Sequence, residues 1–458
     1  MSSPNENWQT TRPTICSRVS YMFNNELMSD VSFVVPVKLG EDGNKKSKME
    51  IPAHKFVLSI SSPVFFAMFF GDLADNTHSV SLPDCEYNSL LELFRFLYCE
   101  QVELNEDNAL QVLYLAKKYI VPSLVEKCIE YLKQNANIST IFTVLANAEK
   151  YEEEYLAKRC WALIDRQTKE ALETEDFLTI ERQLLESLVV RDSLNVKEVD
   201  LFTAVDHWAT KECERLNLSC DGTSKRTVLG DKIVKAIRFP LMSRDEFNGT
   251  VLGQKILNDK ETSSIEEYYN SSSLVEFSQV KRDGLQLQRC GRGYEYRTPV
   301  TTHVIMHHFR RKECICFSAD RDIVLHGVCM YGSINNKYTV FIEVKQNSSH
   351  GPLEATKTGE YDSIPMKDVL GFQWDSTVVH GFDILFDMPV LIKKDAWYHV
   401  RCHEEAAKVG PVIHYNQPID EGFRYAKSPG VTITFTNHKP IEETDYEEHI
   451  AHLIFTLD

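Results

Sequence analysis

The spacing of apolar residues divides the chain into three parts. Apolar positions recur every three or four residues through most of residues 52–135, and the same period continues through residues 136–270. Beyond about residue 275, apolar and polar residues alternate, as they do over residues 338–344. A helix buries one stripe of side chains and a half-buried strand buries every second one. The pattern therefore predicts two largely helical parts followed by a β part.

These parts set the predicted fold class, a multidomain α+β protein. Residues 1–15 are polar, contain two prolines and are expected to be a loose tail. Residues 16–135 combine short strand signals with helices, which predicts a small α/β domain. Residues 136–270 have almost no strand signal and predict an all-α spacer. Residues 275–458 contain several short alternating segments separated by turn residues, which predicts an all-β antiparallel sandwich.

One helix is delimited clearly by its flanking residues. Ser62 is a good N-cap, Pro63 fits the first helical position, and Gly71 fits just past the end, so the sequence predicts a helix over residues 63–70. This helix is apolar all round, and such a helix must be buried on more than one face. One face is expected in the domain core. The other either contacts a partner or packs within the same domain.

Charge and composition exclude several classes of function. The net charge is −17, and residues 1–135, 136–270 and 271–458 carry −5, −7 and −5 of it, so no part offers the basic surface that nucleic acid requires. The most apolar stretch, residues 57–70, is too short and too interrupted by serine and proline to cross a bilayer. No secretory signal is apparent, so the twelve cysteines are expected to stay reduced in a soluble intracellular protein.

A few residues could form a metal, nucleotide or catalytic site. His303, His307, His308, Cys314 and Cys316 are possible zinc ligands. The Cys-x-Cys spacing is unlike a zinc knuckle, and ligands on strands need not converge, so we expect no metal and no cofactor. Gly-Arg-Gly at residues 291–293 does not precede a helical pattern and is not a nucleotide site. No nucleophile or metalloprotease motif is present. The sequence predicts a non-catalytic protein.

Several segments resemble known domains. Residues 29–33 (SDVSF), 51–59 (IPAHKFVLS), 62–69 (SPVFFAMF) and 116–122 (AKKYIVP) together resemble a BTB/POZ domain. Residues 159–165 (RCWALID) and 204–208 (AVDHW) resemble the BACK domain that often follows it. Residues 289–290 (RC), 320–321 (DR) and 327–332 (GVCMYG) resemble the start of a PHR β-sandwich.

The resemblance implies a function. Members of this BTB–BACK–PHR family act as substrate adaptors of cullin-3 ubiquitin ligases. The BTB domain forms a homodimer and binds cullin-3, the BACK domain is a spacer, and the PHR domain presents an unidentified protein substrate for ubiquitination. We expect a cytoplasmic protein, with the nucleus as an alternative. Two rival interpretations are a BTB-mediated scaffold without ligase activity and a zinc-dependent enzyme in the last domain.

The resemblance also implies where cullin-3 binds. Cullin-binding BTB domains carry a hydrophobic–x–Glu motif after the Phe-rich helix, and the matching residues here are Leu73, Ala74 and Asp75. Asp75 is one methylene shorter than the motif's glutamate. Phe69 and Tyr119 are expected to join this contact. The alternative is that this segment is an ordinary polar loop with Leu73 turned inward.

A second set of residues is expected at the dimer interface or in pockets of the BTB domain. Asp30 and Lys55 match a charged pair found in many BTB pockets, and His54 is expected to be a structural histidine. An apolar segment ahead of the first strand is expected to pack across the twofold axis of the dimer, with packing inside one chain as the alternative. It comprises Tyr21, Met22, Phe23, Leu27 and Met28.

Overall fold

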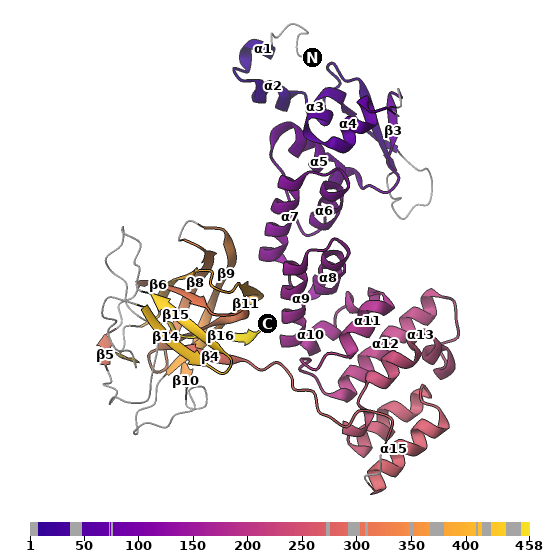
Figure 1. Cartoon of the computed structure of the whole chain (residues 1–458), viewed down its shortest axis with the longest axis vertical. Helices are drawn as coiled ribbons and strands as arrows, with labels where there is room; N and C mark the ends of the chain where they lie inside the picture. The colour runs from indigo at the N-terminus through magenta and orange to yellow at the C-terminus, as the bar shows by residue number, and fades with distance from the viewer. Residues whose placement is uncertain are drawn as a thin grey trace. The chain divides into compact units, whose positions relative to one another are not determined.

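The computed structural model describes residues 8–36, 48–72, 74, 77–271, 275–291, 303–306, 310–348, 351–366, 380–408, 411–414, 423–436 and 450–458. The chain forms two compact units, Met1–Asn135 and Ala136–Asp458 (Figure 1). Both contain helices and strands, which confirms the α+β multidomain class. Across the described residues, every helix is too short or too polar to cross a membrane.

The first unit contains a three-stranded sheet. Strand β1 (Val31–Pro36) pairs antiparallel with β2 (Lys48–Ala53) and parallel with β3 (Ser79–Ser81). Phe33 of β1 is fully buried, and its ring lies edge-on to Phe94 at 4.9 Å and to Phe65 at 5.8 Å. The sheet and the helices of this unit form the predicted small α/β domain. The helices are α1 (Trp8–Thr11), α2 (Ile15–Tyr21), α3 (Lys55–Ser61), α4 (Pro63–Phe70), α5 (Tyr87–Cys99), α6 (Ala109–Lys118) and α7 (Pro122–Asn135).

The expected loose tail contains ordered structure. Residues 8–11 form helix α1, and the ring of Trp8 stacks on Tyr21 of α2 with centroids 5.3 Å apart. The guanidinium of Arg12 lies 3.7 Å from the centre of the same tyrosine ring. A capping box at Thr14 and Ser17 starts α2. Aromatic stacking and this cap order a segment whose polar composition suggested a loop.

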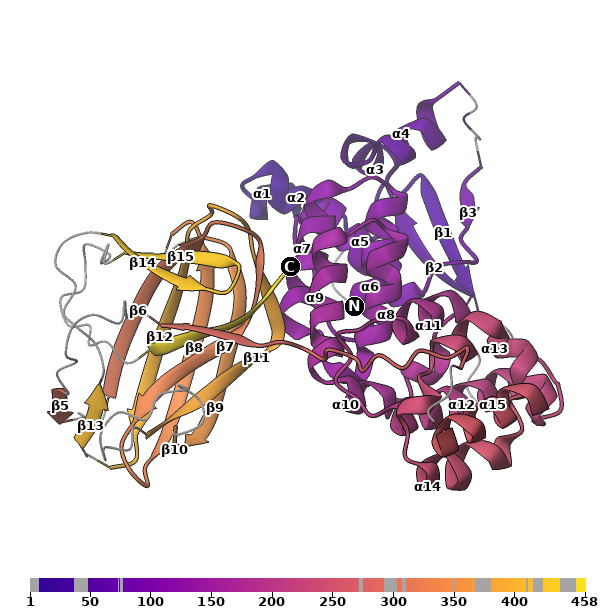
Figure 2. The same cartoon turned by 60° about the horizontal axis from the view of Figure 1, so that its bottom comes forward.

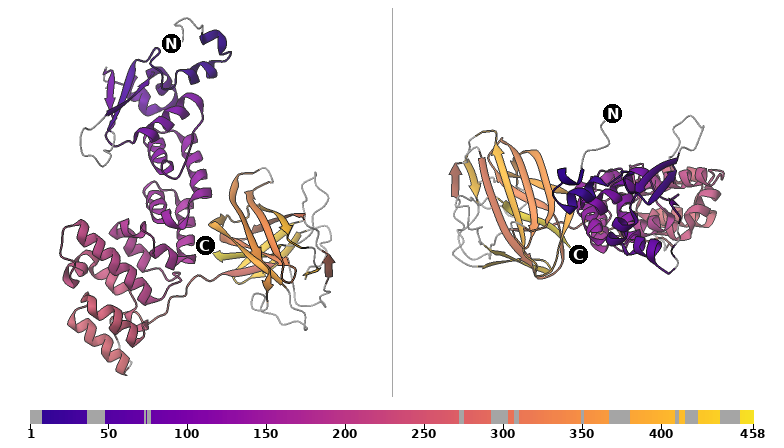
Figure 3. Two further views of the ribbon diagram at one scale, coloured as in Figure 1. Left: turned by 180° about the vertical axis from the view of Figure 1, so that it is seen from behind. Right: turned by 90° about the horizontal axis from the view of Figure 1, so that it is seen from above.

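The second unit opens with a stack of helices, seen from behind in Figure 3. The described residues of this part contain no strand before residue 288, as predicted. The helices are α8 (Ile141–Lys150), α9 (Glu154–Arg166), α10 (Thr168–Leu172), α11 (Arg182–Val189), α12 (Glu198–Arg215), α13 (Gly222–Ala236), α14 (Arg244–Glu246) and α15 (Asp259–Ser271). Short turns join them: η1 (Ile138–Thr140), η2 (Phe177–Thr179), η3 (Phe239–Leu241), η4 (Phe247–Val251) and η5 (Leu252–Gln254).

Two antiparallel sheets follow and face each other (Figure 2). The five-stranded sheet has the order β10-β11-β7-β16-β4 and the six-stranded sheet has the order β14-β15-β6-β12-β8-β9. Strands β5 and β13 form a separate pair. The strands are β4 (Gln288–Gly291), β5 (His303–Met306), β6 (Arg310–Ala319), β7 (Ile323–Gly332), β8 (Lys337–Gln346), β9 (Leu353–Asp362), β10 (Ile364–Pro365), β11 (His380–Ile392), β12 (Tyr398–Ala406), β13 (Pro411–His414), β14 (Phe423–Ser428), β15 (Val431–Thr436) and β16 (Ile450–Leu457).

The sandwich core follows the predicted alternation. Along β8, Tyr338, Val340, Ile342 and Val344 are buried between the sheets, and the residues between them are more exposed. Strand β7 behaves differently, because all ten of its residues are buried. A strand buried in this way must be covered on both faces. One face of β7 packs in the sandwich core, so residues outside that core must cover its other face.

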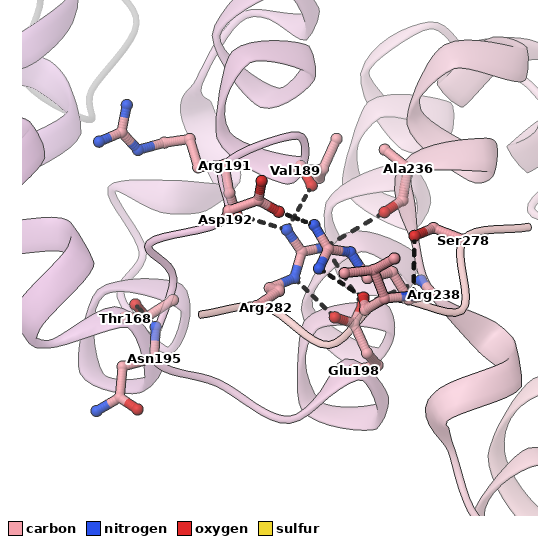
Figure 4. Close-up of polar contacts among 11 residues, drawn as sticks. Thr168, Val189, Arg191, Asp192, Asn195, Glu198, Ala236, Arg238, Ser278 and Arg282 are labelled. Carbon is pink, nitrogen blue, oxygen red and sulfur yellow. Dashed lines mark hydrogen bonds and ion pairs between the residues drawn. The ribbon is translucent and has the colours of Figure 1, made fainter. Parts of the chain in front are cut away.

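The segment that joins the helices to the sandwich is held by two arginines (Figure 4). Arg282 donates to Glu198 Oε1 at 2.7 Å and to three backbone carbonyls, those of Val189 (2.9 Å), Arg191 (2.6 Å) and Ala236 (3.2 Å). The side chain of Arg282 is only 3% exposed and that of Glu198 only 7%.

The second arginine, Arg238, approaches the joining segment from the helical side. It donates to the carbonyl of Val280 at 2.8 Å and pairs with Asp192. Its backbone N–H donates to Glu198 at 3.1 Å, so the same carboxylate serves both arginines. The joining segment is therefore fastened to the helices before the first strand of the sandwich begins.

Candidate functional site

Helix α4 divides its phenylalanines between the core and the surface. Ser62 accepts a hydrogen bond from the N–H of Phe65 and starts the helix. Phe65 and Phe69 lie four residues apart and are buried, with stacked rings 6.0 Å apart. Phe66 and Phe70 lie four residues apart on the other side and are 55% and 57% exposed. The helix is apolar all round, as the sequence indicates, but only one of its faces is covered within the described structure.

A third exposed apolar residue lies beside the start of this helix. The ring of Tyr119 stacks on Phe65 at 4.3 Å, and its carbonyl accepts a 2.6 Å hydrogen bond from Ser62 Oγ. Ile120 follows directly, is 54% exposed and has a positive φ of 52°. A β-branched residue rarely adopts this conformation. The fixed position of Tyr119 thus turns Ile120 outward. We call Phe66, Phe70 and Ile120 the α4 surface.

The structure corrects the position of two residues expected at the cullin contact. Phe69 is 7% exposed and Tyr119 is 1% exposed, so their side chains belong to the domain core and support the α4 surface from below. Ala74 is half-buried, and its N–H donates to the carbonyl of Gly71 at 3.0 Å. Leu73 and Asp75 lie outside the described residues, so the role of this motif stays a prediction.

A second apolar surface lies around α3. Phe56 and Ile60 are each 68% exposed and lie four residues apart on one side of this helix. Leu27 and Met28 are 38% and 71% exposed. The carbonyl of Leu27 accepts a 2.8 Å hydrogen bond from His54 Nε2, directly before α3, so the two segments are joined. Exposed apolar patches of this kind often mark protein interfaces.

The other residues expected at the dimer interface lie partly inside the unit. Tyr21, Met22 and Phe23 are half-buried. Tyr21 contacts Trp8 as described above, and the ring of Phe23 lies 6.0 Å from that of Tyr98. Leu27 and Met28 are the exposed members of the expected set. Whether this surface pairs two chains stays a prediction.

Asp30 and Lys55 contact each other in an unexpected way. Asp30 Oδ1 accepts a 2.7 Å hydrogen bond from the backbone N–H of Lys55, the first residue of α3. The Lys55 ammonium instead lies 5.5 Å from the centre of the Phe69 ring. The carboxylate therefore satisfies one of the free N–H groups at the start of a helix, and a role of the two residues as a charged pair of the pocket stays a prediction.

His54 has the partners of a structural residue. Its backbone N–H donates to the Tyr98 hydroxyl at 2.8 Å, and its Nδ1 lies 2.9 Å from the same oxygen. Because a carbonyl only accepts, Nε2 carries the proton toward Leu27, and Nδ1 accepts from the tyrosine. His54 is 4% exposed. Both ring nitrogens are thus occupied by the fold.

Comparison with known proteins agrees with this architecture. Residues 19–136 match the BTB/POZ domain, residues 141–252 match BACK (BTB And C-terminal Kelch), and residues 306–410 match the PHR domain. BTB/POZ domain-containing protein 6 from Xenopus tropicalis is 36% identical over 398 residues, which cover 86% of this chain and 70% of the relative. The chain belongs to the BTB–BACK–PHR family.

Further relatives match this chain over a similar length. The human BTB/POZ domain-containing protein 6 is 35% identical over 395 residues, 85% of this chain and 69% of the relative. The human BTB/POZ domain-containing protein 3 is 34% identical over 399 residues, 86% of this chain and 72% of the relative. Together the BTB, BACK and PHR domains support a BTB-family adaptor.

The possible zinc ligands lie in or near the PHR domain. His307 and His308 are outside the described residues, and Cys316 is 6% exposed with its sulfur 3.6 Å from His399 Nε2. Burial raises the pKa of the Cys316 thiol to about 12, which opposes the thiolate form that zinc binds. Over the part of the chain that the structure describes, no three His, Cys, Asp or Glu residues are grouped to hold a metal.

Sequence reasoning left open whether the second face of α4 is covered. All four phenylalanines of this helix are equally apolar, and distant rings such as Phe33 and Tyr119 decide which pair is buried. Sequence reasoning overlooked the buried arginines of the second unit, because arginine is usually exposed. For β7 a signal was present, since its run Ile-Val-Leu-His-Gly-Val-Cys-Met-Tyr-Gly is apolar without alternation.

Proposed function

We propose that this protein is a non-catalytic substrate adaptor of a cullin-3 ubiquitin ligase. In this proposal the BTB domain forms a homodimer and binds the cullin, and the PHR domain binds a protein substrate. The site of action is the cytoplasm, with the nucleus as the alternative. Membership of the BTB–BACK–PHR family supports this function, because the family resemblance implies it.

The observation that carries the proposal is the α4 surface. Phe66 and Phe70 leave two large apolar side chains exposed directly before the segment where cullin-binding BTB domains carry their motif, and Ile120 exposes a third beside the start of the same helix. Exposed aromatic side chains supply much of the binding energy at protein interfaces. An apolar cluster of this kind needs a partner that offers a groove. Neighbouring α-helices on a cullin are such a partner.

The α3 surface supports the dimer. Phe56, Ile60, Leu27 and Met28 are exposed on elements that are joined through His54. A twofold pairing would bury the same patch on both chains. Two substrate domains would then share one assembly, which raises the effective concentration of substrate near the ligase.

Titration calorimetry against the N-terminal domain of cullin-3 tests the cullin contact. We expect submicromolar binding with one cullin per chain. Replacing Phe66 and Phe70 by serine should weaken binding by at least about 2 kcal/mol, roughly thirtyfold in Kd, because the anchors of the contact are lost. The fold should persist, since both side chains are more than half exposed.

The control is Val190→Ser, which removes an apolar side chain that is 60% exposed in the BACK domain. This variant should bind like the unaltered protein. Equal binding by the Phe66/Phe70 variant would contradict the assignment of the α4 surface. No binding by the unaltered protein at tens of micromolar would favour the scaffold interpretation, in which the BTB domain only joins chains.

A further inference from the structure

Helix α9 of the BACK domain presents one face to the sandwich within the second unit. Tyr155, Arg159, Ala162 and Arg166 recur at spacings of three or four and lie on one side of the helix. Each of them contacts a residue of the PHR β-sandwich. The contacts come from β7, β9 and β11, strands that lie far from α9 in the sequence.

The centre of this contact is a buried ion pair. Arg159 is fully buried, and its guanidinium lies 3.4 Å from Glu354 Oε2, with the glutamate side chain 6% exposed. Arg159 also donates to the backbone carbonyl of Glu354 at 3.0 Å. The hydroxyl of Tyr155 donates to the same Glu354 oxygen at 2.8 Å. Two residues of one helix, Tyr155 and Arg159, therefore contact the glutamate of the sandwich.

Further polar contacts fasten the helix to the sandwich. At its C-terminal end, Arg166 donates to the carbonyl of Phe386 at 2.6 Å and to that of His326 at 3.3 Å. Lys158 lies on the neighbouring side of the helix and pairs with Asp458 at 2.6 Å. These contacts reach strands β11 and β7 and the residue that follows β16.

An apolar strip fills the space between the polar contacts. Ala162 packs with Val324 of β7 and Leu391 of β11, and all three are at most 8% exposed. Val324 and Leu391 lie outside the main sandwich core, on the opposite face of the five-stranded sheet. Helix α9 thus covers the part of the second face of β7 that lies around Val324 and His326.

We propose that α9 locks the PHR domain to the BACK domain, with Arg159 as the latch, so that the two domains move as one body. The connecting residues 275–287 then act as a strap and not as a hinge, since Arg282 already fastens them to the helices. This inference concerns the rigidity of the second unit and does not depend on cullin binding. If the two domains move as one body, the contacts of α9 set the orientation of the PHR domain relative to the BACK domain.

A distance measurement in the full chain tests this proposal. Spin labels can be placed through non-natural amino acids at Lys232 of α13 and Lys337 of β8, whose side chains are 83% and 67% exposed. In a sample diluted with unlabelled chain, so that distances between the two chains of a dimer do not contribute, pulsed electron paramagnetic resonance should then give one narrow distance distribution. Arg159→Met should broaden it severalfold, because the methionine cannot satisfy Glu354. Arg215→Met, which removes an exposed arginine of α12, should leave it narrow.

A second variant tests the same ion pair from the side of the sandwich, in case Arg159→Met does not fold. Glu354→Gln keeps the size of the side chain and the backbone carbonyl but removes the charge, and it should also broaden the distribution. Far-UV circular dichroism should be unchanged in each variant. A broad distribution in the unaltered protein would overturn the proposal, and so would a narrow one in correctly folded Arg159→Met and Glu354→Gln variants.

Discussion

Replacing Arg282 by methionine is expected to lower the free energy of unfolding of the helical part by about 3–5 kcal/mol. The substitution leaves the buried carboxylate of Glu198 without its main cation and removes the donor from three backbone carbonyls. Buried polar groups that lose their partners destabilise a fold strongly. Urea unfolding followed by tryptophan fluorescence measures the effect, because Trp161 and Trp208 both lie in this part.

Arg282→Lys separates charge from geometry. A lysine keeps the positive charge but lacks the planar group that can donate in several directions at once. The Arg282→Lys variant should therefore lose less unfolding free energy than Arg282→Met and more than the unaltered protein. Arg215→Met is the matched control, since Arg215 lies on the surface of α12 and pairs only with Glu212 among the described residues. An Arg282→Met variant as stable as this control would contradict the strap described for residues 275–287.

Acidification is expected to weaken the sandwich through His326. Burial, together with the nearby Arg166, lowers the pKa of His326 to about 3. In the unfolded chain the pKa returns to about 6.5, so below that pH the unfolded state binds the proton and the folded state does not. Stability is thus complete above pH 6.5 and declines as the pH falls toward 3. By pH 5 the loss from this residue is about 2 kcal/mol.

Urea unfolding at pH 7.5 and pH 5.0 measures this contribution as a difference between variants. His326→Gln keeps a polar group within reach of Thr456, whose hydroxyl lies 3.2 Å from His326 Nε2. Between pH 7.5 and pH 5.0, the free energy of unfolding of the variant should fall by about 2 kcal/mol less than that of the unaltered protein. His207→Gln, at an exposed position of α12, controls for the loss of an imidazole. Equal losses in the His326→Gln variant and the unaltered protein would contradict the prediction.

Local signals predicted much of the fold. Ser62 and Gly71 delimit α4 as expected, because a hydroxyl cap and a steric limit act within a few residues. A side chain at Gly71 would lie 2.5 Å from the carbonyl oxygen of Ala67, so only glycine fits there. The alternation along β8 predicted its buried face in the same way, since the period of a strand depends only on its own backbone.

Features that depend on distant partners were not predictable. Phe65 and Phe66 are identical in the sequence, but Phe65 meets Phe33 and Tyr119 while Phe66 stays exposed. Arg159 lies in a helix with many charged residues, and its burial depends on Glu354, almost two hundred positions away. The spacing of neighbouring residues in the sequence does not indicate that Phe65 or Arg159 is buried. For the same reason, the sequence predicted the segments of the candidate site better than the side chains that form its surface.

The cover that α9 provides affects how binding partners of the PHR domain should be sought. A bait cut to begin at the sandwich would carry Val324 and Leu391 as an uncovered apolar strip, with the Glu354 carboxylate beside it and no arginine to pair with it. Proteins captured by such a bait would include some that recognise this strip, which is hidden in the whole chain. Baits that begin before Glu154 keep the strip covered and present only the surfaces that the intact chain displays.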